Sequence, residues 1–315
     1  MLWWSVLMAC KAPPTPVPTP PVEPVPTGDT GPVVPTADTA PVLDCSVLPE
    51  LPTAFDTLSG FTYAEDFDFD LNGNHVSIRS TNGNLVGIQM DTTVSLIAPN
   101  VSNNAACTRR LPDGDFVVCD VFANSLVRVA AATGAKVTLL SGMAYPNGAD
   151  VDSEGFVYVA EQNAGRLRRV DSTTGEATVI ATNLNAPNGV VLSPDEQTVY
   201  VGSFGSGRVY AVERTGPDTW EQRQLVQAPG GGDFDGIEAD ACGNIYITEY
   251  IDGTVWRIPP SGTGVERVMD LPSSWIPNLR WGSGVGGWDP ETLYVADRDQ
   301  GRVFALPMGI RGAGQ

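Results

Sequence analysis

A segment of about fifteen residues recurs along the chain, and this repetition restricts the possible fold more than any other feature. Each copy has an apolar strand, a polar stretch and a second, alternating strand. Four clear copies span residues 156–170, 198–212, 244–258 and 292–306, and two weaker copies span 75–88 and 116–130. Units of about 40 residues without a helical period are typical of four-stranded blades. The sequence therefore predicts an all-β, six-bladed β-propeller.

The register of the repeat can be checked at the residue that opens each innermost strand. These residues are Glu65, Ala106, Asn147, Asn188, Asp235 and Asn278, at successive intervals of 41, 41, 41, 47 and 43 residues. The longest interval contains the loop 230–232, which has three glycines. The last repeat lacks an outer strand of its own. We expect residues around 53–58 to supply this strand and close the ring, which would leave no sheet edge exposed.

The N-terminus reads as a targeting segment rather than as part of the propeller. Residues 2–9 form an apolar run that is too short to span a bilayer, and Cys10 follows a small residue. This run resembles the lipobox of bacterial lipoproteins, although no Lys or Arg precedes it. The resemblance implies a signal segment over residues 1–10 and lipidation of Cys10. The alternative is a minimal signal peptide that a Cys happens to follow.

The next segment is an expected tether. Residues 11–42 contain eleven prolines and six threonines and no aromatic residue, so they cannot bury a core. The expected organisation is a signal over 1–10, a disordered tether over 11–43 and a propeller over 44–315. An exported protein, held in the bacterial cell envelope only by its lipid, fits this order.

The charge of the chain argues against two classes of partner, nucleic acid and anionic lipid surfaces. The formal net charge is −19, with 18 Lys and Arg against 37 Asp and Glu. Nucleic-acid binding requires an excess of basic side chains, and docking on anionic lipid requires the same. We expect a monomer that binds a small molecule.

Four cysteines remain besides Cys10. Cys107 and Cys119 flank a Pro-Asp-Gly turn and fall nearly opposite one another in the expected hairpin, which permits a cross-strand disulfide. Cys45 and Cys242 would then tie the N-terminal strand to the fifth blade. An even count in an exported protein favours disulfides, and four buried thiols are the alternative.

The residues that open the innermost strands point at one space on the propeller axis. Five of the six carry oxygen in their side chains, and none is Cys or His, which suits a hard divalent cation. Ca²⁺ fits this donor type best, and Mg²⁺, Mn²⁺ or Zn²⁺ are possible. The alternative is that the Asn-Gly pairs at 147–148 and 188–189 and the Asp-Gly pair at 235–236 are turns that enter the strands.

These motifs together resemble the senescence marker protein/gluconolactonase (regucalcin) family of six-bladed propellers over residues 61–309. The family's metal-binding Glu opens the first blade, as Glu65 does within Glu-Asp-Phe-Asp. Its metal-binding Asn stands in an Asn-Gly pair followed by Ser and an acidic turn, as Asn188 does. Its Asp opens an Asp-Gly-Xaa-Xaa-Xaa-Asp run, as Asp235 does. The resemblance implies that these three residues bind one metal ion and that Asn147 contacts substrate.

Two other propeller families match less well. Paraoxonases begin similarly with Glu-Asp, but their working His has no counterpart, since the single His of this chain, His75, lies on a second strand and is interpreted as structural. Strictosidine synthases share the fold and lack the metal-binding set.

The resemblance also implies an activity, because the enzymes of this family hydrolyse lactones. A bound cation would polarise the ester carbonyl and lower the pKa of a water, and Asp235 would accept the proton of that water. The family has an Arg where this chain has Tyr145, which argues against a sugar-acid lactone. Other residues considered for the substrate pocket are Asn278, Arg280, Phe204, Tyr250, Trp275 and Trp281. The aromatic residues fit ordinary blade packing better, and Arg280 could instead pair with an acidic side chain.

Three functions remain open from the sequence. The first is a metal-dependent lactone or ester hydrolase. The second is a non-catalytic binding or surface-interaction module that calcium stabilises. The third is a silent structural or adhesive surface protein. The fold itself cannot choose among them.

Overall fold

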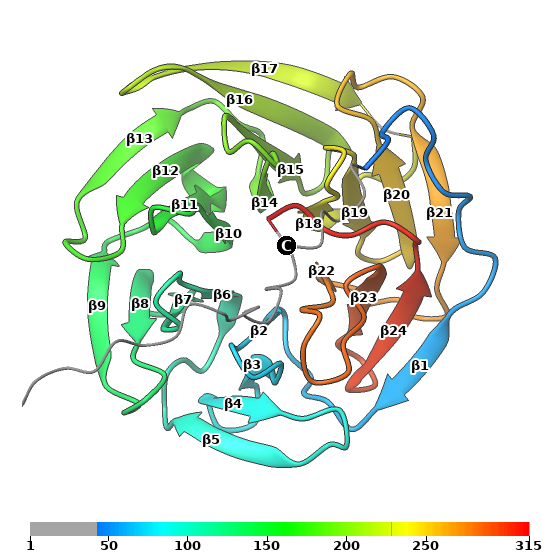
Figure 1. The fold of residues 1–315 in the computed structure, drawn as a ribbon. Coiled ribbons are helices and arrows are strands. Elements are labelled where there is room, and N and C mark those ends of the chain that lie inside the picture. The colour runs from blue at the N-terminus through cyan, green and yellow to red at the C-terminus, as the bar shows by residue number, and fades with distance from the viewer. Residues whose placement is uncertain (1–42, 228, 315) are drawn as a thin grey trace, which may run out of the picture. The chain divides into compact units, whose positions relative to one another are not determined.

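The structure is a computed structural model that describes residues 43–227 and 229–314. Within this part of the chain, six four-stranded antiparallel sheets are arranged as blades around a central axis (Figure 1). The predicted all-β, six-bladed propeller is confirmed. The predicted signal, Cys10 and the tether up to residue 42 lie outside the described residues. No helix in the described ranges has the length and apolarity needed to cross a membrane.

Each of the first five blades is built from four consecutive strands, with the innermost strand first. The first two blades contain β2 (Phe67–Phe69), β3 (His75–Arg79), β4 (Asn84–Ile88), β5 (Val94–Ala98), β6 (Ala105–Arg110), β7 (Phe116–Asp120), β8 (Ser125–Val129) and β9 (Lys136–Ser141). The next two contain β10 (Pro146–Val151), β11 (Phe156–Glu161), β12 (Arg166–Asp171), β13 (Ala177–Ala181), β14 (Pro187–Leu192), β15 (Thr198–Ser203), β16 (Arg208–Gly216) and β17 (Thr219–Gln227). One turn of 3₁₀-helix, η1 (Gln162–Ala164), follows β11.

The last two blades show how the ring closes. They contain β18 (Phe234–Ala239), β19 (Ile245–Glu249), β20 (Thr254–Ile258), β21 (Glu266–Asp270), β22 (Leu279–Trp281), β23 (Thr292–Asp297), β24 (Arg302–Pro307) and β1 (Asp56–Ser59). The N-terminal strand β1 pairs with β24 as the outer strand of the sixth blade, with Thr57 opposite Phe304. The expected closure by an N-terminal strand is confirmed, and it removes an open edge that would otherwise invite aggregation.

The long interval between the fourth and fifth innermost strands has a simple structural origin. Both β16 and β17 are nine residues long, whereas the other strands have three to six. The extra residues extend the outer hairpin of the fourth blade, and the glycine loop at 230–232 then leads back to the axis. The insertion therefore leaves the innermost strands in register.

The core consists of apolar clusters between blades. Each of the six clusters contains residues of two neighbouring blades, and one of them joins the sixth blade to the first through Tyr294, Trp288 and Phe67. His75 packs against the aromatic residues of this cluster, and its ring stacks on Phe67 with 4.5 Å between the ring centroids. Burial lowers the pKa of His75 to about 3, so its ring is neutral. The interpretation of His75 as a structural residue fits this packing.

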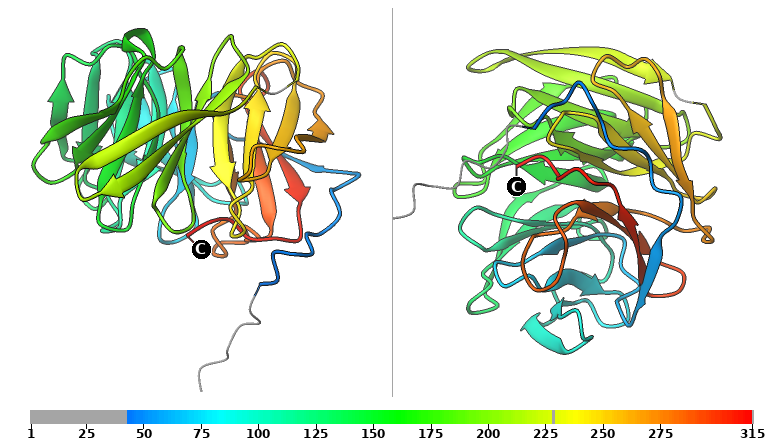
Figure 2. Two further views of the ribbon diagram at one scale, coloured as in Figure 1. Left: turned by 90° about the horizontal axis from the view of Figure 1, so that it is seen from above. Right: turned by 45° about the vertical axis from the view of Figure 1, so that its right-hand side comes forward.

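The propeller has two distinct faces. The innermost strands begin at one face, which we call the upper face, and end at the other, the lower face. The C-terminal segment lies at the lower face (Figure 2, left), where the backbone N–H of Ala313 donates to the carbonyl of Ala239 at the end of β18. The residues that begin the innermost strands therefore share the opposite face with the loops that follow the second strands.

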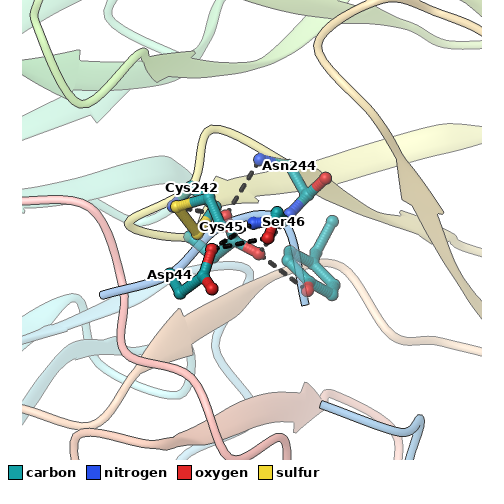
Figure 3. Close-up of a disulfide and its surroundings, with 7 residues drawn as sticks. Asp44, Cys45, Ser46, Cys242 and Asn244 are labelled. Carbon is teal, nitrogen blue, oxygen red and sulfur yellow. Dashed lines mark hydrogen bonds between the residues drawn. A yellow bond between two sulfur atoms is a disulfide. The ribbon is translucent and has the colours of Figure 1, made fainter. Parts of the chain in front are cut away.

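Both predicted disulfides are present. Cys107 and Cys119 are direct partners in the pairing of β6 with β7. Cys45 is bonded to Cys242, in the turn between β18 and β19, so the segment before β1 is fastened to the lower face of the fifth blade (Figure 3). Beside it, Asp44 accepts hydrogen bonds from the backbone and hydroxyl of Ser46.

Candidate active site

The Asn-Gly and Asp-Gly pairs of the repeat lie inside innermost strands rather than in turns. Asn147, Asn188 and Asp235 are each the second residue of β10, β14 and β18, and the register with the neighbouring strand shifts at each pair. Such bulges redirect side chains and are common next to active sites. The interpretation of these pairs as simple turns is therefore wrong.

The glycine of each pair is required by contact with the next blade. A Cβ at Gly148 would lie 2.3 Å from the carbonyl oxygen of Asn188, and a Cβ at Gly189 would lie 2.1 Å from that of Asp235. Gly236 continues the series, because its Cβ would lie 2.4 Å from the Cα of Asn278. Only glycine allows backbones to approach so closely. The spacing of the blades around the site thus depends on these three residues.

Asp235 and Glu65 form the acidic centre of the upper face. Burial raises the pKa of the Asp235 carboxyl well above its ordinary value, and the nearby charge of Glu65 raises it further. A hydrogen bond with the Asn188 side chain opposes these effects. Burial also raises the pKa of Glu65. The structure therefore brings together all three residues of the expected metal-binding set.

An arginine that the sequence analysis did not single out completes this group. Arg298, in the loop between β23 and β24, forms an ion pair with Glu65, and its Nη1 lies 3.4 Å from the hydroxyl of Tyr250. Its charge lowers the pKa of both Glu65 and Asp235, against the effect of burial. The positively charged guanidinium of Arg298 therefore lies next to the two carboxylates of the site.

Asn147 lies on the upper face beside the third blade's loop. Its amide nitrogen donates a 3.0 Å hydrogen bond to Gln162 Oε1, at the start of η1. This bond orients the amide and leaves its second N–H and its oxygen for another partner. The contact of Asn147 with a substrate stays a prediction.

Asn278 has a different role from the expected one. Its amide nitrogen donates to Asp66, and its oxygen accepts a 2.8 Å hydrogen bond from the backbone N–H of Leu279. Asp66 also pairs with Arg109 and accepts a 2.8 Å hydrogen bond from the backbone of Thr108. Asn278 thus belongs to a buried network that joins blades six, one and two, which leaves its amide engaged with protein groups.

Arg280 does not lie in the candidate site. Its guanidinium forms an ion pair with Glu238 and lies 3.6 Å from Asp68. Arg280 also lines two cavities, of about 270 and 380 Å³. The C-terminal residues Ala313 and Gly314 line both cavities as well. These cavities therefore belong to the lower face. Burial raises the pKa of Glu238 to about 7 even though Arg280 is its partner. The alternative of an internal ion pair fits Arg280, and the expected substrate contact does not.

Aromatic rings line one side of the upper face. The rings of Tyr250 and Trp275 are stacked at 6.3 Å and 11°, and Phe204 lies 6.3 Å from Tyr250. Trp275 is 46% exposed, which sets it apart from a packing residue. Tyr145 is half-buried, and burial together with Glu65 and Asp235 raises the pKa of its hydroxyl. Trp281, by contrast, is buried against Tyr246 in the core.

The donor set can be tested against the cation that the family resemblance implies. Among the described residues, no group of three or more His, Cys, Asp or Glu side chains could hold a metal ion. The upper face instead brings together two carboxylates and the amide of Asn188, all oxygen donors of the kind that calcium and magnesium prefer. Besides burial, the charge of Glu65 raises the pKa of Asp235 and the charge of Asp66 raises the pKa of Glu65, and a divalent cation would relieve this repulsion. The residues therefore fit a hard cation, with Arg298 as its competitor for Glu65.

Comparisons with known proteins agree with this geometry. Residues 160–299 match the family model of the SMP-30/Gluconolactonase/LRE-like region. Over these residues the chain is similar to the gluconolactonases. The pentonolactonase XacC of Haloferax volcanii is 29% identical over 134 residues, which are 42% of this chain and 44% of that protein. The match thus spans less than half of the length of this relative.

Two solved structures resemble this propeller over most of its length. A gluconolactonase of Xanthomonas campestris has a TM-score of 0.66 and 18% identity, covering 82% of this chain and 91% of its own. The calcium-binding protein regucalcin of Agrobacterium tumefaciens has a TM-score of 0.63 and 18% identity, covering 82% and 96%. At this identity the likeness shows a shared fold.

Proposed function

We propose that this protein hydrolyses a small-molecule lactone or ester at the upper-face site. The observation that carries the proposal is the proximity of the buried Asp235 to the half-buried Glu65, two carboxylates of raised pKa, next to the Asn188 amide at the positions of the gluconolactonase motifs. The pentonolactonase and gluconolactonase relatives support the reaction class.

Glu65, Asn188 and Asp235 would hold one divalent cation, with Ca²⁺ as the first candidate. When bound, such a cation would polarise the ester carbonyl and lower the pKa of an attacking water. The regucalcin neighbour, a calcium-binding protein, supports this part of the proposal.

The protein's own residues take the remaining roles. Asp235 would accept the proton of the attacking water, because its carboxylate would lie beside the cation that lowers the pKa of that water. Asn147, held by Gln162, binds the substrate's polar groups. Tyr145, Tyr250 and Trp275 form the wall against which the body of the substrate packs. Asn278 and Arg280 have no part in the reaction, since their side chains are bound inside the protein.

We also propose that the protein is exported and anchored in the cell envelope through Cys10. The two disulfides support an oxidising compartment, where such bonds persist.

The test is hydrolysis of a panel of sugar, alkyl and aryl lactones, followed in a pH-stat after removal of metal and after addition of Ca²⁺. The protein should be compared with Asp235→Asn and with Asp218→Asn, which changes an exposed carboxylate in the β16–β17 turn. We expect calcium-dependent hydrolysis that falls by about 10²–10⁴ in Asp235→Asn and is unchanged in Asp218→Asn. Metal binding without turnover of any lactone or ester would favour the non-catalytic binding module instead.

A further inference from the structure

Arg298 is held firmly beside Glu65 by its own loop. Its backbone N–H donates a 3.0 Å hydrogen bond to the carbonyl of Trp275. The preceding residue, Asp297, accepts hydrogen bonds from the backbone N–H groups of Asp299 and Gln300 and pairs with Arg302. The loop is therefore fixed by contacts that do not involve the guanidinium. The side chain of Arg298 can move while its backbone stays in place.

No other basic side chain among the described residues balances the charge of Glu65. Arg109 pairs with Asp66, and Arg280 pairs with Glu238 and Asp68. Among the ion pairs of the described residues, Arg298 is the partner of Glu65. Without it, the carboxylate of Glu65 would have no countercharge beside the buried Asp235, which is costly in a region of low dielectric.

The ion pair is accessible enough to exchange. The side chains of Arg298 and Glu65 are 35% and 22% exposed, so neither is sealed in the core. The hydroxyl of Tyr250 lies 3.4 Å from Nη1 of Arg298, and the Tyr250 ring is itself stacked on Trp275. An arginine that leaves Glu65 would thus find water, a hydroxyl and an aromatic surface, all of which it tolerates well.

From these contacts we propose that Arg298 is an internal counterion that competes with the divalent cation for Glu65. The inference rests on the proposed metal site. In the metal-free protein the guanidinium neutralises Glu65 and stabilises the acidic centre. Binding of the cation then requires Arg298 to leave Glu65 and turn towards Tyr250 and the open upper face. The affinity for the cation is therefore lower than the two carboxylates and the amide alone would give.

The experiment is calorimetric titration of the metal-stripped protein with CaCl₂, together with the melting temperature of each protein with and without Ca²⁺. Arg298→Gln removes the charge, and Arg298→Lys keeps it and loses the planar guanidinium. Arg311→Gln is the matched control, because it makes the same change in net charge at an exposed residue of the lower face. We expect Ca²⁺ to bind Arg298→Gln about tenfold or more tightly than the unmodified protein, and Arg298→Lys with intermediate affinity. Arg311→Gln should keep the original affinity.

The melting temperatures give a readout that is independent of activity. Arg298→Gln should melt below the unmodified protein without metal and close to it with saturating Ca²⁺. Equal or weaker Ca²⁺ affinity in Arg298→Gln, while the unmodified protein binds, would overturn the counterion role and leave the metal site standing. If neither protein binds Ca²⁺, Mg²⁺ or Mn²⁺, both the metal site and the counterion role are wrong.

Discussion

Gly189 lies directly against the backbone of Asp235 in the next blade, so close that a Cβ on Gly189 would be 2.1 Å from the Asp235 carbonyl oxygen. The obstacle is backbone, which cannot rotate away as a side chain can. We expect Gly189→Ala to push the fourth and fifth blades apart and to lower the free energy of unfolding by about 3 kcal/mol. Urea unfolding followed by tryptophan fluorescence measures this change.

Gly231→Ala is the control for this substitution. Gly231 is exposed, and a Cβ there would meet only the Asp252 and Glu249 carboxylates, at 3.2 and 3.4 Å. We expect a change of less than about 1 kcal/mol. Equal losses in the two variants would show that the contact between Gly189 and Asp235 does not set the spacing of the blades.

The Cys45–Cys242 disulfide joins residues that are 197 apart in the sequence. Because it closes a long loop in the unfolded chain, its loss is expected to cost about 2–4 kcal/mol. The double variant Cys45→Ser, Cys242→Ser should unfold at lower urea concentration, and limited proteolysis should cut it before β1. An unchanged midpoint together with unchanged proteolysis would mean that β1 alone holds the N-terminal segment.

His75 gives the protein a defined sensitivity to acid. Its pKa falls from 6.5 to about 3 on folding because of burial, so below pH 6.5 the unfolded chain binds a proton that the native protein does not. Stability contributed by the neutral ring is therefore lost as the pH falls from 6.5 towards 3, by about 1.4 kcal/mol per pH unit. We expect His75→Phe, which keeps a flat ring among aromatic neighbours, to depend less steeply on pH in this range. Identical slopes for the two proteins would contradict the assignment.

Trp275 tests the substrate wall. Because its ring is half exposed and stacked on Tyr250, we expect Trp275→Ala to raise KM by about 3- to 10-fold while kcat changes little. Val137→Ala removes an exposed apolar side chain from β9, the outer strand of the second blade, and should leave KM unchanged. A fall in kcat alone would place Trp275 in the positioning of Asp235 rather than in substrate binding.

The repeat made the fold predictable, because one strand pattern recurs in register six times and each copy can only be a blade. The same register predicted that Asn147, Asn188 and Asp235 share a face, and the pairing of Cys107 with Cys119 followed from the hairpin. These features depend on the position of a residue along its strand, and this position can be predicted directly from the period of the repeat.

The roles of Arg298, Arg280 and Asp66 could not be predicted from the repeat, because they depend on side-chain contacts between different blades. Arg298 occupies the position directly after the second strand of its repeat, where the other clear copies have Gln162, Phe204 and Tyr250. The alignment of the repeats thus located this position, but the four copies have no residue type in common there that would indicate a function. Arg280 was placed wrongly because two residues along a strand are about 7 Å, enough to move a side chain from the upper rim into the interior. Asp66 was overlooked because its network joins three blades.

The most direct test of the whole account is a calorimetric titration of the metal-stripped protein with Ca²⁺ beside Asp235→Ala. We predict binding at a single site in the unmodified protein and no binding in the variant, since Asp235 is the most deeply buried carboxylate of the proposed donor set. Failure of Ca²⁺, Mg²⁺ and Mn²⁺ to bind the unmodified protein would contradict the account, and the upper face would then be a polar pocket whose charge Arg298 alone balances.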